Sequence, residues 1–257
     1  MDDASRGRGG LFSSLASLVS KFTRGPEVTD TVTRTFTVGA GARVVAHNPI
    51  GTLKVHGDGS GAVAVEVVKK GRGEITQQDL ERIQVNCTQD GDLVTVDVVM
   101  DHHLSLDRQM WADLNLTVPT SVNLDLRLEA GALEVHDTRG TLAARVDAGS
   151  IQAEGVNLSG SSRANVDAGQ IQIAGALVGG TTLDVRVDAG RIKLTLPQAT
   201  PARLEASTDV GAINISGWNI PVLRNITSAR AAGDLGPNPS GSLTAHVDMG
   251  EISISVG

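Results

Sequence analysis

The sequence has no tyrosine and only 2% aromatic residues among its 257, so a ligand groove rich in aromatic side chains is not expected. Its one cysteine, Cys87, excludes an internal disulfide bond and the usual zinc cluster, and we interpret it as a small buried or half-buried side chain. Basic residues are outnumbered, 22 against 29 acidic ones, and the formal net charge is −7. This balance disfavours a nucleic-acid partner.

Long hydrophobic runs are also missing. No stretch approaches the ~18 uninterrupted apolar residues that a membrane-spanning helix needs, so none is expected. Asp2 and Asp3, and the lack of a small-residue cleavage site after the apolar segment 11–22, argue against a secretory signal. We therefore expect a cytoplasmic protein, with a peripheral position at a membrane left open.

Residues 1–27 are predicted to form an amphipathic helix and a linker. The helix can cover an end or a flank of the β-structure, or it can dock on a partner protein or an anionic membrane surface, because basic residues flank it; a flexible tail is the third possibility. Its apolar residues, which share one helical face, are Leu11, Phe12, Leu15, Leu18, Val19 and Phe22.

Residues 28–123 are predicted to form a β-rich section that contains one short helix. Apolar and polar residues alternate, as at Val63, Val65 and Val67, which is typical of strands with one buried face. Thr76, followed by Gln-Gln-Asp, has the pattern of a helix N-terminus, so the helix is expected to begin there.

Residues 124–257 repeat one short pattern. Residues 142–151, 162–171 and 183–192 alternate apolar side chains up to an Asp-Ala-Gly turn and resume the alternation after it. The turn glycine recurs at spacings of 18, 20, 21, 21 and 39, and a degenerate coil around Gly233 is expected in the longest gap. This period predicts an all-β fold containing a β-solenoid, in which stacked coils of about twenty residues share one core. The predicted turn glycines are Gly131, Gly149, Gly169, Gly190, Gly211 and Gly250.

An acidic residue occupies the same place in successive coils, and basic or polar residues lie two positions earlier on the same strand face. Stacked carboxylates can bind calcium or act in carbohydrate-cleaving β-helices. The calcium-binding repeat Gly-Gly-x-Gly-x-Asp is absent, however, and neighbouring arginines can offset the repulsion between the acids. We therefore predict a surface charge ladder and assign no metal and no cofactor. Its predicted members are Asp147, Asp167, Asp188, Asp209, Asp248, Arg145 and Arg186.

Three motifs resemble those of a known family. Asn-Pro-Ile-Gly-Thr-Leu-Lys-Val at 48–55 precedes Leu-Asn-Leu-Thr-Val-Pro at 114–119, and Ala-Gly-x-Ile-x-Ile coils follow. In these motifs the chain resembles the bacterial putative-adhesin family of β-strand-repeat proteins over most of its length after residue 30. The resemblance implies a β-solenoid without assigned catalytic residues. The Asp-Ala-Gly turns and the absence of an export signal depart from the family pattern and put surface adhesion in doubt.

The last repeat ends two residues before the end of the sequence, so we expect its coil to be an uncapped end that pairs with another chain, as a homodimer or a filament. Val247, Ile252 and Ile254 are the predicted self-association residues. No nucleophile elbow, phosphate loop or zinc-protease helix occurs, so no enzyme is predicted. The favoured function is a non-catalytic structural or protein-interaction scaffold. The alternatives are a membrane-associated scaffold that resembles the polymer-forming bactofilins and is docked by the N-terminal helix, and a carbohydrate-binding or adhesin β-helix.

Overall fold

The computed structural model describes residues 27–100 and 110–257, which form one sheet of fifteen strands. The predicted all-β class is therefore confirmed. The single helix in these two ranges is α2 (Gln77–Leu80), which begins with a capping box at Thr76, as expected. The strands are β1 (Glu27–Thr37), β2 (Arg43–Asp58), β3 (Ala62–Arg72), β4 (Gln84–Asp90), β5 (Leu93–Val99), β6 (Met110–Pro119), β7 (Asn123–His136), β8 (Arg139–Gly140), β9 (Leu142–Leu158), β10 (Ser161–Leu177), β11 (Thr182–Leu196), β12 (Ala202–Ile215), β13 (Val222–Arg224), β14 (Ala229–Asp234) and β15 (Gly241–Val256).

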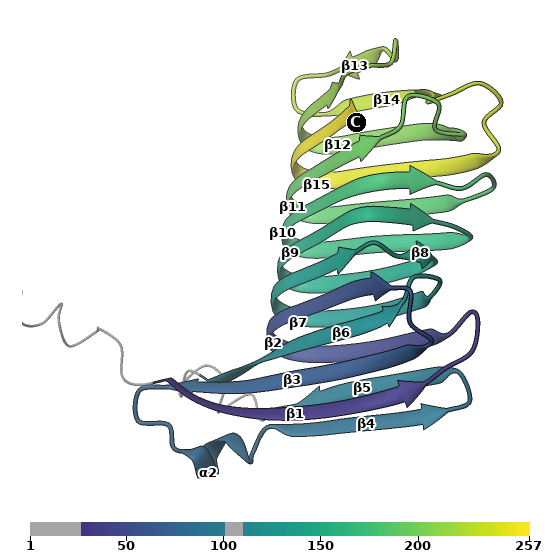
Figure 1. The fold of residues 1–257 in the computed structure, drawn as a ribbon. Coiled ribbons are helices and arrows are strands. Elements are labelled where there is room, and N and C mark those ends of the chain that lie inside the picture. Colours follow the sequence, from purple (N-terminus) through teal and green to yellow (C-terminus); the bar gives the residue numbers. More distant parts are fainter. Residues whose placement is uncertain (1–26, 101–109) are drawn as a thin grey trace, which may run out of the picture.

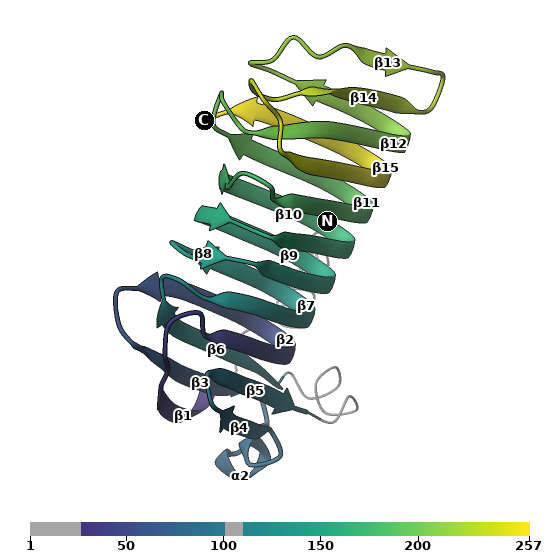
Figure 2. The ribbon, with the colours of Figure 1, turned by 90° about the vertical axis from the view of Figure 1, so that its right-hand side faces the viewer.

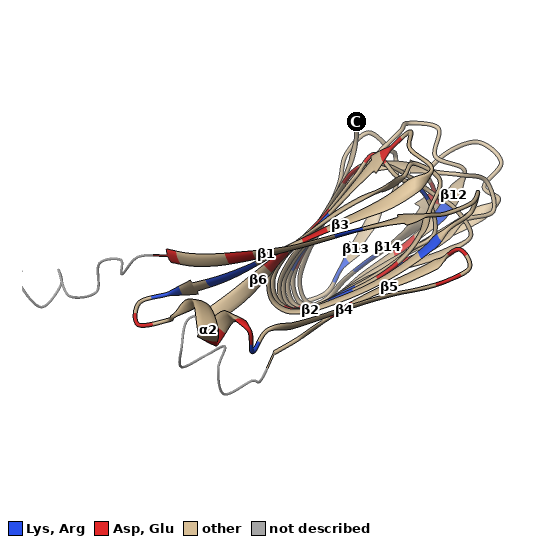
Figure 3. Ribbon diagram, turned by 60° about the horizontal axis from the view of Figure 1, so that its bottom comes forward, with Lys and Arg blue, Asp and Glu red and all other residues tan. Residues whose placement is uncertain are grey.

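Seven long strands form a parallel stack in the order β2, β7, β9, β10, β11, β15 and β12 (Figure 1). Each bends near its middle, so that its two halves lie on opposite sides of a flattened interior (Figure 3). Ile151, Ile171 and Ile192 occupy the same register position on three adjacent strands, and all three are buried. The repeats therefore lie on top of one another and share one apolar core.

A column of stacked glycines makes the bends possible. Every glycine in the column has a positive φ, between 126° and 149°, which favours a residue without a Cβ. A Cβ added to Gly169 would lie 1.8 Å from the carbonyl oxygen of Gly149 on the strand below, and the contact repeats along the column. In stack order the column is Gly51, Gly131, Gly149, Gly169, Gly190, Gly250 and Gly211.

The strand order corrects two predictions about the last repeats. Strand β15 is paired on both sides, with β11 and with β12, so the final repeat is not an uncapped end. Val247, Ile252 and Ile254 are no more than 1% exposed and belong to the core, so they cannot form a self-association surface. Gly233 does not mark a further coil either, because β14 runs antiparallel to β12 at the outside of the stack.

The other end of the stack divides into two layers (Figure 2). The first half of β2 pairs with β5, which pairs with β4, whereas the second half pairs with β6, which leads to β3 and β1. The α2 segment closes this end, with Leu80 and Ile83 fully buried. The predicted helix face at residues 11–22 lies outside the described residues. In the described ranges, no helix has the length and apolarity that a membrane crossing requires.

Candidate functional site at the capped end of the stack

The acidic column lies on the outer face of the stack, beside its bend. Arg145 forms salt bridges with Asp147 of its own strand (3.0 Å) and Asp167 of the next strand (2.8 Å). Arg186 repeats the arrangement with Asp188 (3.3 Å) and Asp248 (3.2 Å). These carboxylates raise the pKa of Arg186, and the hydrogen bond that Arg186 donates to Asp188 is the largest cause. Each of these two guanidinium groups thus bridges two acids on adjacent strands of the ladder.

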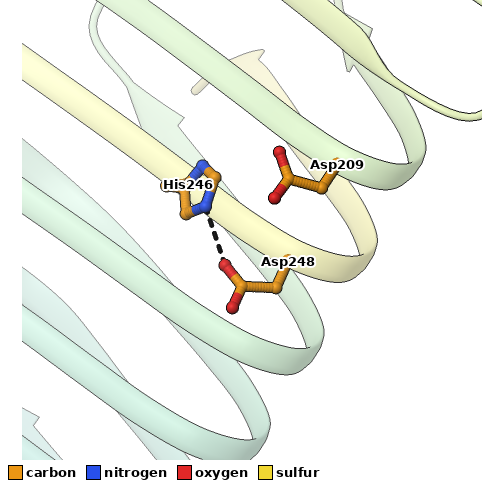
Figure 4. A group of neighbouring side chains, drawn as sticks. All are labelled: Asp209, His246 and Asp248. Carbon is orange, nitrogen blue, oxygen red and sulfur yellow. Dashed lines mark ion pairs between the residues drawn. The ribbon is translucent and has the colours of Figure 1, made fainter.

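The ladder changes at the end of the stack formed by β15 and β12. These strands carry His246 and Ser207 at the position of the arginines. His246 contacts Asp248 through Nε2 (2.7 Å) and Ser207 Oγ through Nδ1 (2.8 Å). Asp209 projects from β12 toward the same point, and ligand atoms of Asp209, His246 and Asp248 all lie within 4.8 Å of one another (Figure 4). This group is called the Asp-His cluster below.

A cap covers β12 at the end of the stack. The cap comprises residues 216–240, with the short strands β13 and β14, and half-buried Trp218 anchors it by donating its indole N–H to the carbonyl oxygens of Gln198 and Leu235. Strand β14 covers only the first half of β12, pairing with residues 203–208. The outermost part of the stack is therefore formed by short strands and loops.

An open cleft of about 420 Å³ lies between the cap and the outer face of β12. Apolar side chains form much of its wall, Glu205 and Arg230 supply charge, and Ser207 and Thr244 supply hydroxyl groups. Ser207 also contacts His246, so the cleft and the Asp-His cluster adjoin. The residues that line the cleft are Glu205, Ala206, Ser207, Pro221, Leu223, Arg230, Ala231, Ala232 and Thr244.

Exposed apolar side chains gather around this end. Leu223 is 74% exposed and Ile226 is fully exposed, both at or beside β13. Val210 and Met249 are paired neighbours on β12 and β15, and each is more than half exposed. Among the described residues, only Val99 and Val178 are further large apolar side chains with such exposure. Four of the six exposed large apolar side chains of the described residues therefore lie at the capped end.

The predicted turn glycines and the predicted ladder acids thus form two columns, and the predicted self-association residues lie in the core. The six predicted turn glycines form one column, and Gly51, which the repeat pattern missed, extends it by one strand. The predicted ladder acids lie in one column as well, but Asp248 lies between Asp188 and Asp209 in the stack. The contacts of Ser207 with His246, and of Asp209 with the cluster, could not be read from the sequence because β12 and β15 are separated by the cap.

Cys87 lies far from this site, on β4 at the two-layer end of the stack. Its side chain is half-buried, and this burial raises the pKa of the thiol. A raised pKa means less thiolate at neutral pH, and hence a less reactive sulfur.

No protein-family model matches the chain, and no curated protein matches it either. Among solved structures, a putative cell adhesion protein from Clostridium sporogenes is similar at 11% identity, with a TM-score of 0.50, over 89% of this chain and 100% of that one. A putative adhesin from Bacteroides fragilis is 12% identical, with a TM-score of 0.36, over 88% and 97%. A putative lipid binding protein from Parabacteroides distasonis is 10% identical, with a TM-score of 0.29, over 89% and 97%. At these identities, the likeness to the first protein concerns the fold alone.

Proposed function

We propose that the chain is a non-catalytic β-solenoid that acts as a protein-interaction module, that its cap is the binding end, and that its partner is a second copy of the chain. The carrying observation is the group of exposed apolar side chains at the cap, led by Leu223 and Ile226, beside an open cleft. Contiguous exposed apolar surface on a folded protein marks an interaction site. The proposal replaces self-association through the last coil, which lies inside the stack.

The edge of β13 supports a second copy as the partner. Within the described residues β13 pairs only with β14, so its outer edge carries backbone groups without a strand partner. Such an edge is a template for another strand. Two copies related by a two-fold axis can pair their β13 edges antiparallel, and this places the two Leu223 side chains close together.

The cleft gives this interface a place for an inserted side chain. Its wall includes Pro221 and Leu223 of the same cap, and Ile226 protrudes nearby without any covering atoms. In a two-fold arrangement, Ile226 of each copy can enter the cleft of the other. Burial of an apolar anchor in a pocket is the usual source of binding energy at an interface.

A second candidate function is adhesion to another molecule. The protein from Clostridium sporogenes that shares the fold is named as a cell adhesion protein, and the cleft is a concave surface with both apolar and charged walls. A cytoplasmic location is also part of the proposal. Docking of the scaffold to a membrane or to a partner protein through the segment 11–22 is a further alternative.

The test is the oligomeric state of the full chain, measured by analytical ultracentrifugation from about 1 μM to about 1 mM. We expect a dimer, and a dissociation constant at least about tenfold weaker for Leu223→Ser and Ile226→Ser. Val178→Ser is the matched control, because Val178 is 51% exposed on a different part of the stack. A monomer throughout this range, or equal dimerisation of all variants, would contradict self-association and favour adhesion.

A further inference from the structure

The Asp-His cluster differs from the rest of the charge ladder in its donor atoms. Two other pairs of adjacent acids in the column are each bridged by a guanidinium, because Arg145 bridges Asp147 and Asp167 and Arg186 bridges Asp188 and Asp248. Between β15 and β12 an imidazole takes that place, and the carboxylate of Asp209 has no ion pair or hydrogen bond with any described residue. An imidazole can ligate a metal ion, whereas a guanidinium cannot.

The hydrogen bonds of His246 hold the ring in a suitable position. Ser207 Oγ lies 2.8 Å from Nδ1, and Asp248 Oδ1 lies 2.7 Å from Nε2. Metal-binding histidines commonly use their second nitrogen in this way, because the bond fixes the ring orientation. With Nδ1 donating to Ser207, Nε2 presents its lone pair to the two carboxylates, and a cation can replace the proton that otherwise joins Nε2 to Asp248.

The charge of the surroundings also favours a cation. Asp188, Asp248 and Asp209 are successive carboxylates in the column, and among the described residues Arg186 is the only guanidinium that bridges any of them. Three negative groups and one positive group leave a local charge of −2 when His246 is neutral. Arg186 Nη2 lies 3.2 Å from Oδ1 and 3.4 Å from Oδ2 of Asp248. Because a carboxylate has two acceptor atoms, Arg186 can stay on one oxygen and release the other to the ion.

We propose that Asp209, His246 and Asp248 form a Zn²⁺ site that ties β15 to β12. One imidazole and two carboxylates form a ligand set that zinc accepts, with a fourth position open to water on this outer face. Calcium requires six to eight oxygen ligands, and magnesium uses oxygen ligands and water rather than imidazole. The ligand atoms lie within 4.8 Å of one another, so small rotations of the side chains bring them to zinc distances.

The site would tie together two adjacent strands that the cap separates in the sequence. Asp209 lies on β12, before the cap, whereas His246 and Asp248 lie on β15, after it. A bound ion stabilises the folded state by mass action, because the unfolded chain does not hold these ligands together. Zinc is therefore expected to slow the opening of β15 from the stack.

The experiment is a calorimetric titration of the EDTA-treated, dialysed full chain with Zn²⁺. Asp209→Asn and His246→Gln should each weaken binding at least about tenfold. Asp167→Asn is the matched control, because Asp167 is an acid of the same column that pairs with Arg145. His102 and His103 are adjacent in the sequence and are a second possible source of zinc binding. A variant in which both are replaced by alanine should bind zinc as the unaltered chain does.

A second measurement tests whether zinc holds β15 against β12. Amide hydrogen exchange across residues 241–256 should slow when Zn²⁺ is added to the unaltered chain, and it should not respond in Asp209→Asn, whose side chain is exposed and not needed for packing. Absence of zinc binding by the unaltered chain, or binding that both cluster variants retain, would overturn the site.

Discussion

The middle of the stack and its capped end are built from one repeat but differ in order and in chemistry. Strands β9, β10 and β11 follow one another in space as they do in sequence, and Arg145 bridges the acids of β9 and β10. At the capped end β15 lies between β11 and β12. A histidine and a serine replace the arginines there, and apolar side chains are exposed. Repetition therefore specifies the register between neighbouring strands, but it does not specify which repeats become neighbours.

The glycine column should show the strongest difference between a stacked and an unstacked position. Gly169→Ala places a Cβ 1.8 Å from the Gly149 carbonyl oxygen at a φ of 142°, so neighbouring strands must separate. We expect a loss of about 3 kcal/mol or more in the free energy of unfolding, measured by urea denaturation. Gly59→Ala is the control, since nothing lies within 4 Å of its Cβ and it should change stability by less than about 0.5 kcal/mol. Equal effects would mean that the turns are not stacked.

The position of β15 inside the stack predicts the next largest effect. Ile252 is fully buried between neighbouring strands, so Ile252→Ala removes buried methylene groups and leaves a cavity. We expect it to lower the free energy of unfolding by about 2–4 kcal/mol. Ile226→Ala deletes the same atoms from a fully exposed side chain and should change the stability of the monomer very little. A mild effect at Ile252 would indicate that the last repeat is at an open end after all.

The same comparison explains how much could be predicted from the sequence. Alternation and glycine spacing predicted the bent strands, their register and the buried faces at Ile151, Ile171 and Ile192, because these depend on neighbouring residues and on a period. The insertion of β15 could not be predicted, since any copy can pair with any other through the same pattern. Only the 39-residue spacing indicated an irregularity, and we interpreted it as a degenerate coil.

The candidate site depends on that unpredicted step. Ser207 and His246 lie two positions before Asp209 and Asp248, as the repeat pattern requires, but their contact requires β12 and β15 to be adjacent. The cleft depends on the short antiparallel strands of the cap, for which the repeat pattern holds no information. The sequence could predict contacts between one repeat and the next repeat along the chain, such as the bridge from Arg145 to Asp167.

The arginine ladder should give the smallest effect. Arg145 is about two-fifths exposed and bridges two partly exposed acids, so water and salt screen its interactions. We expect Arg145→Ala to lower the free energy of unfolding by about 0.5–1 kcal/mol at low ionic strength, and by less in 1 M NaCl. Arg163→Ala on the adjacent strand is the control, because Arg163 has no salt bridge with a described residue and should show neither the loss nor the salt dependence. A large, salt-independent loss at Arg145 would instead mean that its aliphatic stem packs against the sheet, and that the middle of the stack relies on this contact rather than on charge.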